Sequence, residues 1–267
     1  ISQEDYYALQ AVFAGVGKGD ITFYGSAAHQ HRHQLLLQLQ DAARRKDAGP
    51  LLSSDHTDIV QDWLVRQQPE PVAWHTLQAE TFVSDGGATL TRQSDGSLLA
   101  GGPVPDEERY SVTSRTALRR ITALRVEALP DESLPHHGPG RAANGNFHLS
   151  EVKLQWFPEA GLSPQHLAVR HTAADYDQDG WTSAQAIDGD RRSGWAIYPE
   201  VGRGHQIVLE LAEPLEISGP GVLAVTLQHL YPPQHVIGRF RLAVTGAGTG
   251  RARPLAAGVV AALQLPA

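Results

Sequence analysis

The chain has 267 residues, and its 22 Lys and Arg against 29 Asp and Glu give a formal net charge of −7. This acidic balance argues against nucleic acid or an anionic membrane surface as a partner, because both need a basic face. The length is enough for one large domain, or for a small domain beside a medium one, with a buried core.

Cysteine and methionine are both absent from the chain. Without cysteine there can be no disulfide, no zinc thiolate site, no cysteine nucleophile and no thioether-linked haem. Without methionine the chain has no initiator residue, and we expect it to be a piece of a longer protein. No stretch reaches the roughly 18 to 20 apolar residues of a membrane span, and the first residues lack the pattern of a secretion signal.

The pattern over residues 1–70 predicts a helical segment, comprising the end of a neighbouring domain and a helical hairpin. Apolar residues recur at helical spacing over 6–13, and a stretch without Gly or Pro predicts a second helix over 27–46. A third helix, over 53–64, would follow a turn at 48–50 and complete the hairpin.

The segment 71–246 predicts a mainly β domain, an antiparallel jelly-roll sandwich, because short runs rich in β-branched residues are separated by turn residues. The spacers are too short for the crossover helices of a parallel sheet. We expect about ten strands. Residues 247–267 are expected to be a linker and the start of a further element. The clearest alternating runs are Leu124/Val126/Ala128, Ile207/Leu209/Leu211, Leu223/Val225/Leu227 and Phe240/Leu242/Val244.

The run from Phe147 to Trp156 changes phase part of the way along. A β-bulge near 150–151 would explain that slip within one continuous strand. Trp156, Trp195 and Phe240 alternate with aliphatic residues, which predicts core positions for all three.

Asp175, Asp177 and Asp179 have the alternate spacing of the first half of an EF-hand loop, in which oxygens converge on calcium. The closing Glu of such a loop is missing. The alternative is an acidic turn whose Asp side chains accept hydrogen bonds from local backbone amides.

A second acidic motif, Asp188-Gly-Asp190-x-x-Ser193-x-Trp195, resembles the signature of galactose-binding-like β-sandwiches, the superfamily of discoidin and related carbohydrate-binding modules. In that superfamily the loop often wraps a structural calcium ion. The resemblance implies Asp188, Asp190 and Ser193 as calcium ligands and Trp195 as a core residue. A purely structural turn is the alternative.

Four further segments stand out together, namely 5–16, 138–151, 194–197 and 237–245. They resemble the middle region of large planctomycete-type cytochrome c proteins, and the resemblance covers most of the chain. In these, domains of unknown function flank a β-sandwich. It implies an exported protein, periplasmic or at the cell surface, whose haem lies in another domain and whose flanking domains are partners within the same chain.

A sugar site needs aromatic rings that stack on the C–H face of a pyranose, beside polar groups that bind its hydroxyls. Trp181 and Tyr231 lie beside Gly or Pro in expected loops, where exposure is favoured. The full set of candidates is Trp181, Tyr198, Tyr231 and Phe147 for the rings, with Arg141, Asn144, Asn146, His205, His235 and Arg239 as polar partners.

Three functions remain open from the sequence. The first is a non-catalytic module that binds polysaccharide or oligosaccharide for a larger exported protein. The second is an interdomain scaffold of a cytochrome c-type protein. The third is a glycan-active enzyme, although no catalytic acid and nucleophile can be selected among 29 acidic residues without geometry.

Overall fold

The computed structural model describes residues 26–45, 47–51, 53, 55, 72–159 and 163–248. The chain divides into two compact units, 1–68 and 69–267, and each is described by itself. Among the described helices, none is long and apolar enough to cross a membrane.

The first unit contains helix α2, Ala27–Arg44, where the sequence predicts a helix over 27–46. The hydroxyl of Ser26 accepts a hydrogen bond from the backbone N–H of His29, 3.2 Å away, and so caps the helix. The helix expected over 6–13, and most of the one expected over 53–64, lie outside the described residues. The helical hairpin therefore stays a prediction.

The turn expected at 48–50 is instead a short helix, α3, Ala48–Leu51. The Asp47 carboxylate accepts the N–H of Gly49 at 3.1 Å, as a capping side chain does. The prediction of a turn at 48–50 was wrong. Pro50 lies in the first turn of α3, where proline interrupts no helical hydrogen bond, so it does not prevent a helix there.

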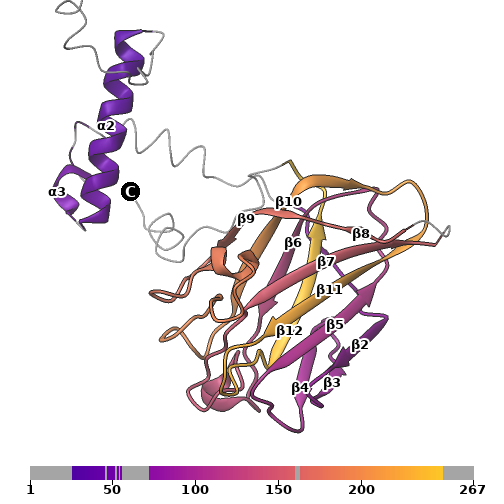
Figure 1. Cartoon of the computed structure of the whole chain (residues 1–267). Helices are drawn as coiled ribbons and strands as arrows, with labels where there is room; N and C mark the ends of the chain where they lie inside the picture. Colours follow the sequence, from indigo (N-terminus) through magenta and orange to yellow (C-terminus); the bar gives the residue numbers. More distant parts are fainter. Residues whose placement is uncertain are drawn as a thin grey trace, which may run out of the picture. The chain divides into compact units, whose positions relative to one another are not determined.

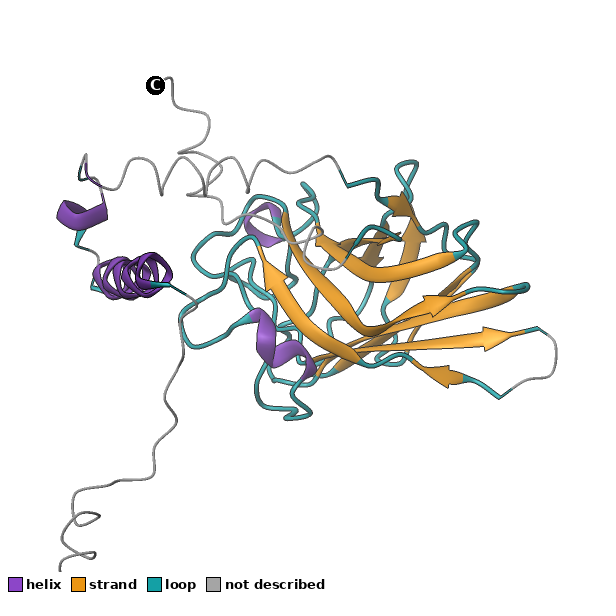
Figure 2. Cartoon of the chain, turned by 90° about the horizontal axis from the view of Figure 1, so that it is seen from above, coloured by secondary structure: helices purple, strands orange, loops and turns teal. Residues whose placement is uncertain are grey.

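The second unit is an antiparallel sandwich of two sheets, which confirms the expected mainly β fold (Figures 1 and 2). The first sheet has the order β3-β4-β12-β6-β10-β9, with β1 paired to β12, and the second has the order β2-β5-β11-β7-β8. The described strands number twelve rather than about ten, because β1 and β8 have only two residues each and escape a pattern search.

Strands of the first sheet are β1 (His75–Thr76), β3 (Thr89–Arg92), β4 (Leu98–Gly101), β6 (Arg120–Ala128), β9 (Val169–Ala174), β10 (His205–Glu216) and β12 (Arg239–Thr245). Strands of the second sheet are β2 (Thr81–Ser84), β5 (Glu108–Ser114), β7 (Glu151–Pro158), β8 (Gln165–His166) and β11 (Gly221–His229). Two 3₁₀ helices, η2 (Pro135–His137) and η3 (Ser183–Ile187), lie in the loops.

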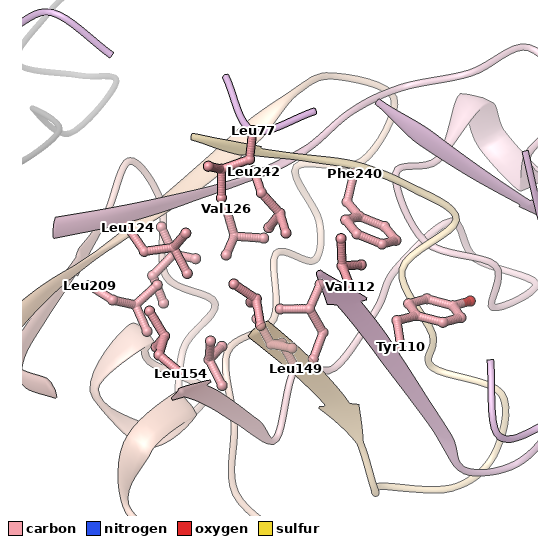
Figure 3. Packing of buried hydrophobic residues seen from close by; sticks show 14 of the residues in the cluster. Leu77, Tyr110, Val112, Leu124, Val126, Leu149, Leu154, Leu209, Phe240 and Leu242 are labelled. Carbon is pink, nitrogen blue, oxygen red and sulfur yellow. The ribbon is translucent and has the colours of Figure 1, made fainter. Parts of the chain in front are cut away.

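The core fills the space between the two sheets. Figure 3 shows Leu124 and Val126 of β6 in one cluster with Tyr110 and Val112 of β5, so both sheets contribute to the same core. Full burial of an aliphatic side chain stabilises the fold by about 1.5–3 kcal/mol. All members of the four alternating runs are buried, as are Trp156, Trp195 and Phe240, which confirms their predicted core positions.

The run that changes phase is not one bulged strand. Strand β7 begins only at Glu151, and residues 147–150 form a loop that pairs with the segment between β9 and β10 through an isolated bridge between Leu149 and Trp195. The bulge prediction was wrong because the change of phase marks a change of backbone partner where the strand begins. This loop supplies one of the residues of the candidate site.

Candidate functional site

Two of the aromatic residues expected to contact sugar, Trp181 and Tyr231, meet at the surface of the sandwich. Their ring centroids are 5.1 Å apart and the ring planes are inclined by 66°. The imidazole of His148 contacts both rings, at 4.7 Å from Trp181 and 4.9 Å from Tyr231. His235 lies beside Tyr231 at 6.5 Å. We call Trp181, Tyr231, His148 and His235 the aromatic corner.

The aromatic corner is exposed on one side and buried on the other. Tyr231 is 37% exposed and Trp181 is half-buried, so both rings are accessible in part. His148 is only 3% exposed and forms the base on which the two larger rings rest. The corner therefore offers apolar ring surface to solvent while being supported from below.

Three loops supply the corner: 129–150 between β6 and β7, 175–204 between β9 and β10, and 230–238 between β11 and β12. Figure 1 shows the first two of these loops on the same side of the sandwich. The backbone N–H of His148 donates to the carbonyl of His235 at 2.9 Å. Backbone hydrogen bonds of this kind fix the relative positions of segments that are far apart in sequence.

Trp181 is held by local hydrogen bonds at the start of η3. Its backbone N–H donates to the carbonyl of Gln178 at 2.8 Å, which closes a turn. The next residue, Thr182, forms a capping box with Gln185, whose side-chain oxygen accepts the N–H of Thr182 at 2.8 Å. Trp181 therefore lies in a hydrogen-bonded turn directly before the start of η3.

His148 is a neutral, buried support. Burial and the neighbouring His235 lower its pKa to about 4. Its Nδ1 lies 3.2 Å from the hydroxyl of Ser150, which also accepts the backbone N–H of Leu230 at 3.0 Å. The Ser150 hydroxyl proton is then free to be donated to Nδ1. The Nε2 atom of His148 is buried without a hydrogen-bond partner.

Polar groups of the corner remain available to a ligand. Nδ1 of His235 lies 2.7 Å from the carbonyl of Pro233 and must carry the proton that it donates, which leaves Nε2 as an acceptor. Within the described part of the chain, neither the hydroxyl of Tyr231 nor the indole N–H of Trp181 has a protein partner. The rings are therefore accompanied by both donors and an acceptor.

Phe147 is not a surface ring, so its expected role in sugar contact was wrong. It is fully buried, with its ring 5.0 Å from Trp195 in an edge-to-face arrangement. Tyr198 is 48% exposed, and its backbone N–H donates to the side chain of Gln178 at 3.0 Å. Its ring makes no contact with the corner rings among the residues described.

Arg141 and Arg239 are structural side chains, which corrects their expected role as sugar partners. The buried guanidinium of Arg141 donates to the carbonyls of Pro103 and Gly102 at 2.9 and 2.6 Å. That of Arg239 donates to the hydroxyl of Ser97 at 2.9 Å and to a carboxylate oxygen of Asp95 at 3.1 Å. Their donors are used within the protein.

His205 was also wrongly expected at the sugar site. Its side chain is buried, with Nδ1 3.0 Å from a carboxylate oxygen of Asp175 and Nε2 2.6 Å from the carbonyl of Glu200. Asn144 is exposed and accepts the N–H of Asn146 at 3.1 Å. Asn146 itself is buried and is not available to a ligand.

His148 is the residue of the corner that sequence reasoning did not find. Its neighbours Phe147 and Leu149 are both fully buried, and a polar residue inside an apolar run is the signal that could have found it. Two such residues in the run from 147 to 150, His148 and Ser150, hydrogen-bond each other.

The oxygens of the Asp188 motif accept hydrogen bonds from within their own loop. The hydroxyl of Ser193 lies 2.9 and 2.8 Å from the two carboxylate oxygens of Asp188 and donates its one proton to this carboxylate, and one of these oxygens also accepts the N–H of Asp190 at 2.8 Å. The Asp190 carboxylate accepts the N–H of Arg192 at 2.9 Å. These are the bonds of a structural turn.

The Asp175 motif is bonded in the same way. One oxygen of Asp175 accepts the N–H of Gln206 at 2.7 Å, and Asp177 accepts the N–H of Ser183 at 2.8 Å, while Asp179 is exposed. In the described residues, no group of three or more His, Asp or Glu side chains is placed to hold a metal ion. Calcium binding therefore stays a prediction from the sequence.

Comparison with known proteins gives weak likenesses of fold. No family model matches the chain, and no curated protein matches it. A carbohydrate-binding module of family 29 aligns over 66% of this chain and 86% of its own length, with 9% identity and a TM-score of 0.25. A mutant family 29 module, from work on ligand recognition, aligns over 65% and 89%, with 9% identity and a TM-score of 0.23. Because these TM-scores are low, the functional conclusion rests on the aromatic corner and the sandwich that carries it.

Proposed function

We propose that the sandwich is a non-catalytic carbohydrate-binding module that binds polysaccharide or oligosaccharide at the aromatic corner. The observation that carries the proposal is the meeting of Trp181 and Tyr231, from two loops far apart in sequence, on one exposed surface. A module of this kind would serve a larger exported protein, with the flanking domains as its partners.

The chemistry of the corner suits a sugar. The C–H faces of a pyranose pack on aromatic rings, and its hydroxyls need donors and acceptors beside those rings. Trp181 and Tyr231 supply the ring surface. The indole N–H, the phenol hydroxyl and Nε2 of His235 supply the hydrogen-bonding groups.

Binding is favoured over glycan cleavage by the composition of the corner. Glycoside hydrolysis uses a pair of carboxyl groups on either side of the scissile bond. The four side chains that define the corner include no carboxylate. Of the alternatives, the interdomain scaffold needs no exposed ring pair, and the presence of one favours the binding module over it.

The test is affinity electrophoresis of the whole chain in gels that contain plant or algal polysaccharides. We expect at least one polymer to retard the protein, and we expect Trp181→Ala and Tyr231→Ala each to abolish that retardation. Phe157→Ala is the matched control, because Phe157 is a 39% exposed ring on β7 that is not part of the corner. Retardation by no polymer would contradict the proposal and leave the scaffold as the better interpretation.

A further inference from the structure

The shape of the aromatic corner determines which form of carbohydrate it can take. We infer that it takes a single sugar ring of a soluble glycan and does not bind the flat face of a crystalline polysaccharide. This inference rests on the proposed function and adds the class of ligand.

The inclination of the two rings prevents both from stacking on one flat surface. A sugar ring stacks when its C–H face lies parallel to the aromatic plane, at a van der Waals separation of about 4 Å. A crystalline polysaccharide presents the faces of all its sugar rings in one plane. Because Trp181 and Tyr231 are inclined by 66°, only one of them can lie parallel to such a plane. The other aromatic ring would project edge-on toward the polysaccharide surface or point away from it.

The contact between the two rings limits the corner to one stacked sugar. Their centroids are 5.1 Å apart and their planes are inclined by 66°, so the two rings contact each other edge to face and turn their free faces in different directions. A pyranose stacked on the free face of one ring meets the other ring at its edge, and the next sugar of the chain would have to turn by a similar angle to stack on that other ring. The corner therefore surrounds one sugar from two sides.

The base of the corner keeps this angle fixed. His148 lies nearly perpendicular to Trp181, at 83°, and is tilted by 34° from Tyr231. Its ring is buried and its backbone N–H is bonded to the loop that carries Tyr231. The two exposed rings cannot become coplanar without displacing this support.

Among the residues that the structure describes, the other exposed rings do not extend the corner into a flat platform. Phe157 lies on β7, in the strand part of the second sheet, and Tyr198 makes no ring contact with the corner among the described residues. The polar groups of the corner, Nε2 of His235 and the indole N–H of Trp181, can supply an acceptor and a donor to the hydroxyls of the one enclosed sugar.

The experiment compares glycan length with glycan crystallinity. Titration calorimetry of the whole chain with mono- to hexasaccharides of the gluco, manno, xylo, galacto and chito series measures the length dependence. We expect binding by at least one series, with an affinity that changes less than about threefold beyond the disaccharide. Trp181→Ala and Tyr231→Ala should each weaken it by at least about tenfold, which corresponds to about 1.4 kcal/mol. Tyr198→Ala should leave it unchanged.

Depletion by crystalline cellulose and crystalline chitin provides the second arm, in which we expect none of the protein to be removed. A steady gain in affinity up to the hexasaccharide, or a loss with Tyr198→Ala, would overturn the single-ring inference but not the proposed function. If a crystalline polymer removes the protein from solution and Trp181→Ala abolishes this depletion, the single-ring inference is overturned and the proposed function is not. Absence of binding in every series would overturn the single-ring inference, and it would overturn the proposed function as well if no polymer retards the protein in the gels.

Discussion

Gly194 lies against the imidazole of His148, so closely that a Cβ on Gly194 would come within 2.6 Å of the Cε1 atom of His148 and within 2.5 Å of the Leu149 carbonyl oxygen. The loop that carries Trp181 can thus pack on the base of the aromatic corner only because position 194 has no side chain. Gly194, the residue before Trp195 in the Asp188 motif, therefore has a packing role at the site.

We therefore predict that Gly194→Ala destabilises the sandwich and disturbs the corner together. Overpacking of this kind costs about 1–3 kcal/mol in the free energy of unfolding, because backbone and a buried ring must both shift. Denaturant unfolding measures the stability. Calorimetry with the best-binding oligosaccharide measures the effect on the corner, where we expect a weaker affinity.

Gly219→Ala is the control for this substitution, because a Cβ at position 219 meets nothing within 4 Å. We expect its stability and affinity to match those of the unmodified chain. A Gly194→Ala protein as stable as the Gly219→Ala protein would show that the loop adjusts freely and that the contact with His148 does not set the geometry of the corner.

Calcium should have no effect on stability. The carboxylate oxygens of Asp188 and Asp190 already accept hydrogen bonds from Ser193 and from backbone amides of their own loop. A ligand that binds only the folded state raises the melting temperature by mass action. We expect thermal melts with excess EDTA and with millimolar calcium chloride to superimpose.

A rise in melting temperature with calcium, reversed by EDTA, would contradict this expectation and support the calcium site predicted from the sequence. Asp188→Asn would then identify the motif responsible, because it removes a charge from that motif while keeping an acceptor oxygen for Ser193. Asp177→Asn would play the same part for the other acidic motif, where the acceptor is needed by the N–H of Ser183.

The sandwich could be predicted from the sequence because the alternation of a strand is a local signal. Leu223, Val225 and Leu227 show which face of β11 is buried without any knowledge of the neighbouring strands. The loop at 147–150 could not be predicted in the same way, because its partners, Trp195 and His235, come from other loops.

The site could be predicted only in part, for a related reason. Trp181 and Tyr231 were expected at the surface from the loop residues beside them, but their meeting depends on contacts between loops. Arg141 and His205 were expected to bind a ligand, yet loop carbonyls that turn inward need buried donors, and these two side chains supply them. The sequence does not show whether a polar loop residue binds a ligand or donates a hydrogen bond to the protein's own backbone.

The stability of the sandwich should fall on acidification because of two buried histidines. Burial lowers the pKa of His229 to about 3 and that of His148 to about 4, from an ordinary value of 6.5. The folded state therefore keeps both imidazoles neutral, while the unfolded chain binds protons below pH 6.5. Stability is fully present above about pH 6.5 and is lost as the pH falls toward 4, by about 1.4 kcal/mol per pH unit for each histidine.

His229→Phe tests this dependence at the histidine that lies farther from the proposed ligand site. Both nitrogens of His229 are buried without a hydrogen-bond partner, and its ring packs edge-on to Tyr110 at 5.4 Å, so phenylalanine can replace it without leaving a polar group unpaired. We expect stability at pH 7.5 to be equal or higher, and the loss between pH 6.5 and 4 to be about half that of the unmodified chain. Denaturant unfolding across this range measures both. His166→Gln, at an exposed position on β8, is the control and should keep the full loss. An unchanged slope in His229→Phe would show that His229 does not become protonated on unfolding in this range, and that other groups set the acid sensitivity.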